Sequence, residues 1–159
     1  MAVSEIIAIE SWLYDTLNND SDLRDLLAVT TKSPGYQQGV YSMLVPQVDP
    51  ISKKSPLCPY VVYVAQDATD DVRTICGQRI LSYPTYTITV WDRQNGNVSF
   101  NRIAPIINRV DELIDNQYVN DTTGIFVCNR LRSSIQMPVP ESGRVDYGIS
   151  HTYRFTMQL

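Results

Sequence analysis

The chain has 159 residues, of which 43% are hydrophobic and 19% charged, a composition typical of one soluble globular domain, which we place over residues 1–159. A formal net charge of −4 argues against tight nucleic-acid binding, which draws on many Lys and Arg contacts to phosphate. No apolar run approaches the ~18 residues that span a membrane, and Glu5 and Glu10 interrupt the apolar start, so no membrane association or signal peptide is expected.

The first third of the chain predicts two helices followed by two strands. Apolar residues recur at steps of three and four from Ser4 to Leu17, which indicates an amphipathic helix. Asp20 or Ser21 can cap a second, short helix that ends near Leu27. Strands are expected at 40–45 and 60–65. In the second of these, the residues at both sets of alternating positions are apolar. This predicts an interior strand that is covered on both faces.

A third strand is expected from Arg79 to Trp91. Tyr86, Ile88 and Val90 share one parity and should face the helices, while threonines occupy the other parity and should face outward. Pro84 cannot donate a ladder hydrogen bond, so a bulge or an edge is expected there. The connection before this strand is long for a hairpin, and the flanking strands are expected to continue into it as a projecting ribbon.

The second half predicts one long helix and two further strands. The helix runs to about Asn116. Because proline is tolerated only in a first turn, Pro105 indicates either a start close to Ile103 or a kink at the start of the helix. A strand over 125–135 is followed by a long turn region rich in proline and glycine, and then by an alternating strand over 149–159. The predicted fold is α+β, a mainly antiparallel sheet of four to five strands with two main helices packed on one face.

No pattern in the sequence indicates catalysis or a cofactor. His151 is the single histidine, and its aromatic strand neighbours favour a buried ring with one satisfied hydrogen bond over a catalytic base. The three cysteines are widely and irregularly spaced, which favours reduced thiols over a disulfide framework or a zinc site. The cluster Asp67, Asp70 and Asp71 lacks the spacing of a calcium loop. We therefore expect a protein that is not an enzyme and that holds no metal.

The order of these elements resembles the tail terminator and tail-completion proteins of tailed bacteriophages. The resemblance covers Ser4 to Leu159. It rests on six segments in this order: SDLRDLL, VYSMLVPQ, CPYVVYV, YTITVWDR, IAPIINRVDELID and DYGISHTYRFTMQL.

This resemblance implies a structural virion protein in the neck region of the tail, assembled in the host cytoplasm. Such proteins form a ring, usually hexameric, on the head-proximal end of the tail tube, where the ring stops tube polymerisation and offers a surface for head joining. The implied partners are copies of the chain itself, the tail tube protein, head-completion or neck proteins and, in a contractile tail, the sheath protein. Two other readings stay open: another head–tail connector, such as a head-closure or adaptor component, and a non-viral α+β binding module.

Two polar segments are the expected contact sites for these partners, the first over 67–78 and the second over 136–147. Long loops in a compact domain are usually functional or disordered. The first is predicted to carry a mixed-charge tip and the second a stretch stiffened by prolines, which loses less entropy on docking. The candidate interface residues are Asp67, Asp70, Asp71, Arg73, Met137, Pro138, Val139, Pro140, Glu141 and Arg144.

Overall fold

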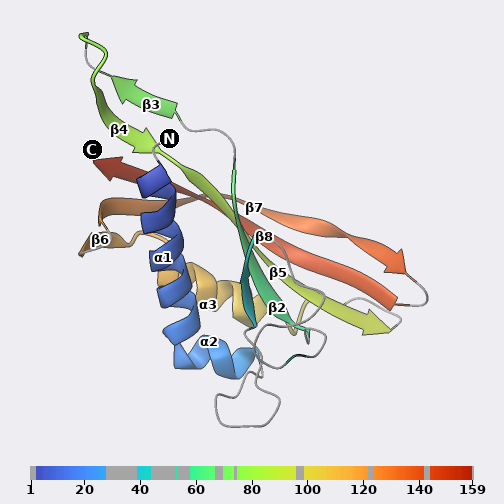
Figure 1. Cartoon of the computed structure of the whole chain (residues 1–159). Helices are drawn as coiled ribbons and strands as arrows, with labels where there is room; N and C mark the ends of the chain where they lie inside the picture. Colours follow the sequence, from blue (N-terminus) through green and yellow to red (C-terminus); the bar gives the residue numbers. More distant parts are fainter. Residues whose placement is uncertain are drawn as a thin grey trace.

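The computed structural model describes residues 3–27, 39–43, 53, 58–66, 70–73, 75–95, 99–121, 124–141 and 144–158. The helices are α1 (Val3–Asn19), α2 (Ser21–Leu26) and α3 (Ala104–Ile114). The strands are β1 (Val40–Ser42), β2 (Tyr60–Ala65), β3 (Asp70–Arg73), β4 (Arg79–Tyr83), β5 (Thr85–Asn95), β6 (Tyr118–Asp121), β7 (Gly124–Glu141) and β8 (Arg144–Gln158). The predicted α+β class is confirmed, and Figure 1 shows the helices on one side of a twisted sheet.

The sheet is built around β8, which pairs antiparallel with β7 along one edge and with β5 and β4 along the other. β5 pairs antiparallel with β2, β4 with β3, and β7 with β6, whereas β1 runs parallel to β2. The sheet is therefore mainly antiparallel, as predicted, but the expected four to five strands are too few, because the described residues form eight. The additional strands include β3, which lies in the segment where a projecting ribbon was expected, and β6, for which no strand was expected.

Pro84 divides the predicted third strand into β4 and β5. Its carbonyl oxygen still accepts a hydrogen bond of 2.9 Å from the backbone N–H of Phe155, so β8 runs past the break without a gap. On the other edge the partner changes from β3 to β2. A proline thus marks the point where one long strand changes neighbours, in keeping with its missing N–H donor.

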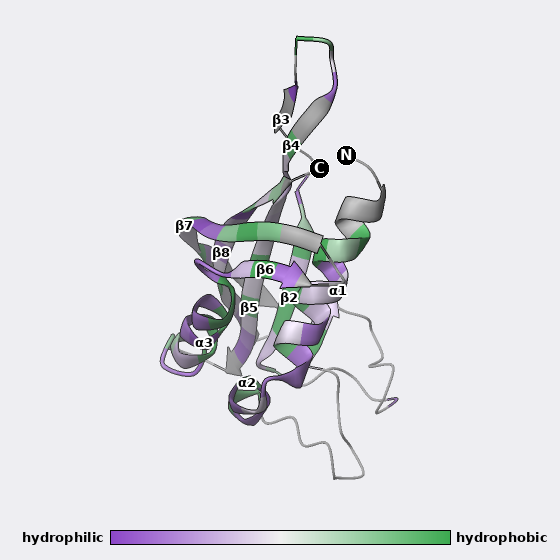
Figure 2. Ribbon diagram, turned by 90° about the vertical axis from the view of Figure 1, so that its left-hand side faces the viewer, coloured by the Kyte–Doolittle hydropathy of each residue, from purple (hydrophilic) through white to green (hydrophobic). Residues whose placement is uncertain are grey.

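One parity of the central strands faces the helices and forms the core. Tyr86, Ile88 and Val90 are fully buried, as their parity predicts. Each helix buries an apolar stripe on this face, and Figure 2 shows the three helices lying over it. The helical core residues are Ile9, Leu13, Leu17, Leu23, Leu27, Ile106, Ile107, Val110 and Ile114.

The local signals for the helices are also confirmed. Asp20 is the N-cap of α2, and its carboxylate accepts a hydrogen bond of 2.7 Å from the backbone N–H of Leu23. α3 begins directly after Ile103, with Pro105 in its first turn. The aromatic ring of Trp12 on α1 packs edge-on against Phe126 and Phe155, which joins α1 to the two longest strands.

Two strand pairs project from the body at opposite ends, as Figure 1 shows. The first ribbon is β3–β4, which confirms the predicted projection. The second is the far end of β7–β8, with β5 alongside, and here the expected turn region is wrong, because strand continues to Glu141 and resumes at Arg144. The prolines are tolerated because Pro138 falls at a register shift and this part of β7 has no second strand beside it among the described residues.

Candidate assembly surfaces

The sheet face opposite the helices is lined by hydroxyl groups. Thr89 of β5 and Ser150 of β8 face each other with their side-chain oxygens 2.7 Å apart, and Thr87 and Thr152 form the next pair at 3.3 Å. Cross-strand pairs of this kind stabilise a sheet. The outward orientation predicted for the threonines is confirmed, and the pairing makes this face polar without leaving these hydroxyls unsatisfied.

Side chains from β7 lie across these hydroxyls. The amide nitrogen of Gln136 donates to the Ser150 hydroxyl at 2.7 Å, and the guanidinium of Arg132 lies 3.4 Å from the Thr152 hydroxyl. Ser150 and Thr152 are consequently buried although no helix covers them. The hydroxyl row, Gln136 and Arg132 form one continuous polar layer, which we call the polar face.

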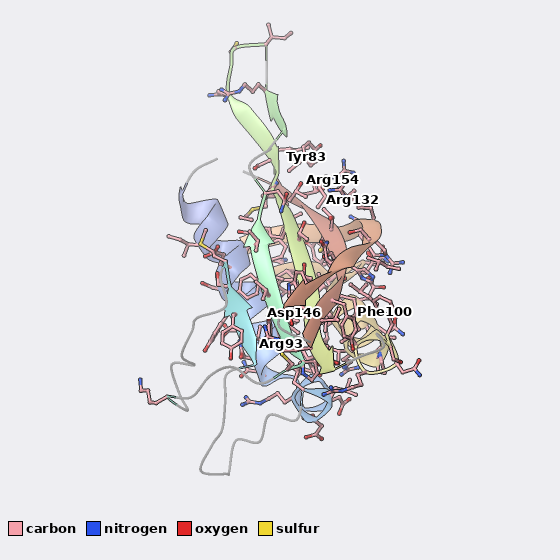
Figure 3. All side chains as sticks on the ribbon, turned by 90° about the vertical axis from the view of Figure 1, so that its right-hand side faces the viewer. Tyr83, Arg93, Phe100, Arg132, Asp146 and Arg154 are labelled. Atoms are coloured by element: carbon pink, nitrogen blue, oxygen red, sulfur yellow. The ribbon has the colours of Figure 1, made fainter. Side chains whose placement is uncertain are left out.

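Three arginines mark the polar face, which Figure 3 views directly. At one end, Arg93 and Asp146 form a bidentate pair, with nitrogen–oxygen distances of 2.5 and 2.7 Å. The hydrogen bond to Asp146 raises the pKa of Arg93. At the other end, the guanidinium of Arg154 lies 5.5 Å from the ring centre of Tyr83. Arg132 and Arg154 are exposed, so the polar face carries positive charge together with its hydroxyls.

Gly148 leaves room for a neighbouring aromatic ring on this face. It pairs with Trp91 of β5 and with Gln136 of β7. A Cβ at Gly148 would lie 2.8 Å from the carbonyl oxygen of Val90 and 3.2 Å from a ring carbon of Trp91. The glycine therefore allows the three strands and the indole to approach closely at the base of the second ribbon.

A buried polar cluster holds the second ribbon against the start of α3. The hydroxyl of Tyr147 lies 2.8 Å from a carboxylate oxygen of Asp92 and 2.9 Å from the carbonyl oxygen of Ser99. The guanidinium of Arg102 lies 3.2 Å from the same carboxylate of Asp92, which is almost fully buried. Burial raises the pKa of Tyr147, so the phenol stays protonated as a donor. This cluster positions the ribbon rather than presenting a reactive group.

His151 is buried, as its strand neighbours predict, within a second cluster on the helix face. Its Nδ1 lies 3.2 Å from the Tyr153 hydroxyl and 3.4 Å from the Asp111 carboxylate. Tyr153 donates to Asp111 at 3.0 Å, and Arg130 pairs with Asp111 at 2.6 Å. Burial lowers the pKa of His151 and outweighs the opposing influence of Asp111. The cluster ties α3 to β7 and β8.

The structure separates the two groups of predicted contact residues. Asp70, Asp71 and Arg73 lie on β3 in the first ribbon, while Asp67 lies outside the described residues. Met137, Pro138, Val139, Pro140 and Glu141 lie on β7, and Arg144 begins β8, in the second ribbon at the opposite end. The sequence reasoning missed Arg132 and Arg154, because they became part of one surface only through the pairing of β7 and β8.

Within the described residues, no group of three or more His, Cys, Asp and Glu side chains is arranged to hold a metal ion. In the same part of the chain, no helix has the length and apolarity required to cross a membrane.

No protein-family model matches the chain, and no curated protein matches it. Among solved structures, the fold is similar to that of a chain in the virion of a native gene transfer agent particle, with a TM-score of 0.60, 16% identity and 91% of both chains covered. A second solved structure has a TM-score of 0.52 at 14% identity, over 93% of both chains. The chain is thus similar in fold, over most of its length, to a chain of a virion particle.

Proposed function

We propose that this chain is a structural virion protein that forms a ring on the head-proximal end of a tail tube, stops tube polymerisation and provides the surface for head joining. The observation that carries the proposal is the shared fold with a chain of a gene transfer agent virion, over 91% of both chains. The specific terminator role comes from the resemblance of the sequence to phage tail terminators. The first is a likeness of the backbone fold, and the second is a resemblance in the order of short sequence segments.

The shape of the subunit suits a closed ring. Ring closure needs a head-to-tail interface, in which two different surfaces of one subunit meet on neighbouring copies. The β3–β4 ribbon projects from the body at one end, so the subunit offers one projecting surface that differs from the rest of its outline. The ring is proposed to be hexameric, to bind the tube protein on one side and head-completion or neck proteins on the other, and to contact the sheath where the tail is contractile. Its place is the neck of the virion, after assembly in the host cytoplasm.

The polar face is proposed to line the channel of this ring. Its hydroxyls are paired across β5 and β8, and Arg93 is neutralised by Asp146. The lining would offer a polyanionic genome mainly satisfied hydroxyls and two exposed arginines, Arg132 and Arg154, which are too few for tight phosphate contacts, and the net charge of −4 per subunit adds repulsion. The proposed role is structural, with no catalysis and no cofactor.

A capping assay tests this function. Purified tail tube protein is polymerised with and without the chain, and tube lengths and ends are examined by electron microscopy. We expect a ring at one end of each tube and shorter tubes as more of the chain is added, because a capped end cannot grow. Binding to portal complexes but not to tubes would favour a head-closure or adaptor component. Binding to neither would favour a non-viral module.

A further inference from the structure

The tip of the β3–β4 ribbon combines positive charge with a fully exposed apolar side chain. Ile75 has a relative exposure of 107%, and the adjacent Cys76 is exposed. In the sequence from Val72 to Ile80 the charged residues are Arg73 and Arg79, while Asp70 and Asp71 begin β3 on the side of the body. The guanidinium of Arg73 donates to the carbonyl oxygen of Gly77 at 3.4 Å, which places this charge beside the turn. A fully exposed isoleucine side chain adds no stability to the isolated subunit.

The outer side of α1 combines negative charge with exposed apolar groups. Between Val3 and Asn19 the sequence has Glu5, Glu10 and Asp15 and neither lysine nor arginine. A hollow of about 320 Å³ lies between α1 and the edge of the sheet, lined by Glu10, Ser11, Tyr14, Asp15, Ser42 and Tyr63. Ile7 and Tyr14, two helical turns apart on this side, are 57% and 44% exposed.

Two carboxylates, those of Glu10 and Asp15, line the hollow together with the buried Tyr63. Tyr63 is buried at the base, and its burial raises the pKa of the phenol. The carboxylates of Glu10 and Asp15 act in the same direction, since they disfavour a second negative charge nearby. A positively charged segment entering the hollow would meet two carboxylates and the exposed ring of Tyr14.

We propose that the β3–β4 tip of one copy docks into the α1 hollow of the next copy. Arg73 would face Glu10 and Asp15, and Ile75 would be buried against Tyr14 and Ile7. The tip points away from the body of its own chain, as both views of the ribbon show. The surface that receives the tip therefore belongs to another molecule. Charge complementarity and the matching apolar groups select a second copy of this chain as the partner.

This contact is heterologous, because the tip and the hollow are different surfaces of one subunit. Such a contact repeats from copy to copy and closes into a ring when the rotation between copies permits it. The inference therefore rests on the proposed ring and names the surfaces that form it. It also assigns the first ribbon to contacts between copies, which leaves the second ribbon for the tube or the head.

A cross-linking experiment with the native tip cysteine tests the contact. The variant Tyr14→Cys is mixed with tail tubes, and separately concentrated alone, and mild oxidation is followed by non-reducing electrophoresis. We expect a ladder of covalent oligomers up to the ring size, because each link joins a tip to the next hollow. The matched control Tyr14→Cys/Cys76→Ser lacks the tip thiol and should give no ladder beyond dimers. A product limited to dimers, or a bond between Cys76 and the tube protein, overturns the inference.

Charge exchange gives a second measurement that does not depend on thiols. Arg73→Glu alone, or Asp15→Arg alone, should reduce the yield of rings on tubes at least tenfold, whereas the double variant should recover most of it. Both sites are exposed, and unchanged circular dichroism will show that each variant folds. Rings that form normally with both single variants, and without the ladder, contradict this contact and leave the proposed function standing. A ladder from the concentrated protein, with no ring on any tube, supports the contact and contradicts the tube-capping function.

Discussion

Gly148 of β8 lies opposite Trp91 of β5, and the space that a side chain would need at Gly148 is occupied by the indole and by the carbonyl oxygen of Val90. The backbone oxygen cannot move without disturbing the β5–β8 ladder. We predict that Gly148→Ala lowers the free energy of unfolding by about 1–3 kcal/mol, the usual cost of overpacking. Denaturant titration measures it, with the exposed Ser134→Ala on β7 as the control. Equal stability of the two variants would show that Gly148 has no packing role.

Ile88 and Thr87 are neighbours on β5 but face opposite sides of the sheet. Ile88 is fully buried under the helices, so Ile88→Ala should cost about 2–5 kcal/mol, and Ile88→Asp should abolish folding. Thr87→Ser keeps the hydroxyl that pairs with Thr152 and should change stability very little. Thermal unfolding of the three variants is the measurement. Similar midpoints for Ile88→Ala and Thr87→Ser would contradict the assignment of the two faces.

Asp20 predicts a specific dependence of stability on pH. The hydrogen bonds from Arg109 lower the pKa of Asp20 below its ordinary value of 3.8, and the N–H of Leu23 adds to this, while burial opposes it. A lowered pKa in the folded state means that the carboxylate stabilises the protein above about pH 4. This stabilisation is lost as the pH falls through the folded-state pKa, because folding then requires the protonated group to give up its proton.

The variant Asp20→Ala should therefore lose about 0.5–2 kcal/mol near pH 6, in the range of a lost N-cap. The difference from the unsubstituted protein should shrink as the pH falls below about 4. Urea titrations at several pH values measure this, with Asp22→Ala as the control, since Asp22 is mostly exposed and lies 3.3 Å from Arg109. A difference between Asp20→Ala and the unsubstituted protein that does not vary with pH would exclude the ion pair as its cause.

Weak affinity for duplex DNA is a further expectation. The net charge is −4, and Arg93 is paired with Asp146, so only a few cations on the polar face are available to phosphates. We predict no salt-sensitive binding at physiological ionic strength, measured by fluorescence anisotropy with labelled duplexes. A tight complex whose affinity falls steeply with added salt would argue against a channel that lets the genome pass.

The second ribbon should matter for assembly and not for folding. The end of β7 at Glu141 and the start of β8 at Arg144 lie at its far end, beyond the helices in Figure 1. Replacing residues 137–144 with a Gly-Ser link should leave the thermal midpoint close to its original value. In a phage that lacks the gene, this variant should fail to restore plaques and should leave tails of uncontrolled length or tails without heads. Normal plaque formation would remove this ribbon from the functional surface.

Local patterns in the sequence predicted the helices, the interior strand β2 and the buried parity of β5. These features follow from period, capping residues and proline position, which are properties of short segments. The end of β7 was expected to be a turn because it contains Pro138 and Pro140. The error has a physical cause: proline is excluded from interior strands but is tolerated at bulges and on an unpaired edge, and the pairing decides which applies.

The surfaces were less accessible to sequence reasoning than the elements. Asp20 and Arg109 are 89 positions apart, and nothing local indicates that they meet. The polar face was foreseen on β5, but its pairing with Ser150 and Thr152 depends on register, which a one-residue shift would reverse. Ile75 belongs to a segment that the sequence analysis treated as polar. Only the pairing of β3 with β4 shows that this side chain lies exposed at the tip of a ribbon.

The most direct test of the central claim is a cryo-electron microscopy reconstruction of the neck of the assembled particle. The account predicts a closed ring of copies of this chain between the last ring of the tail tube and the head-completion proteins, with β5 and β8 facing the channel. A reconstruction that places the chain on the portal side alone, elsewhere in the particle, or as a single copy would contradict it.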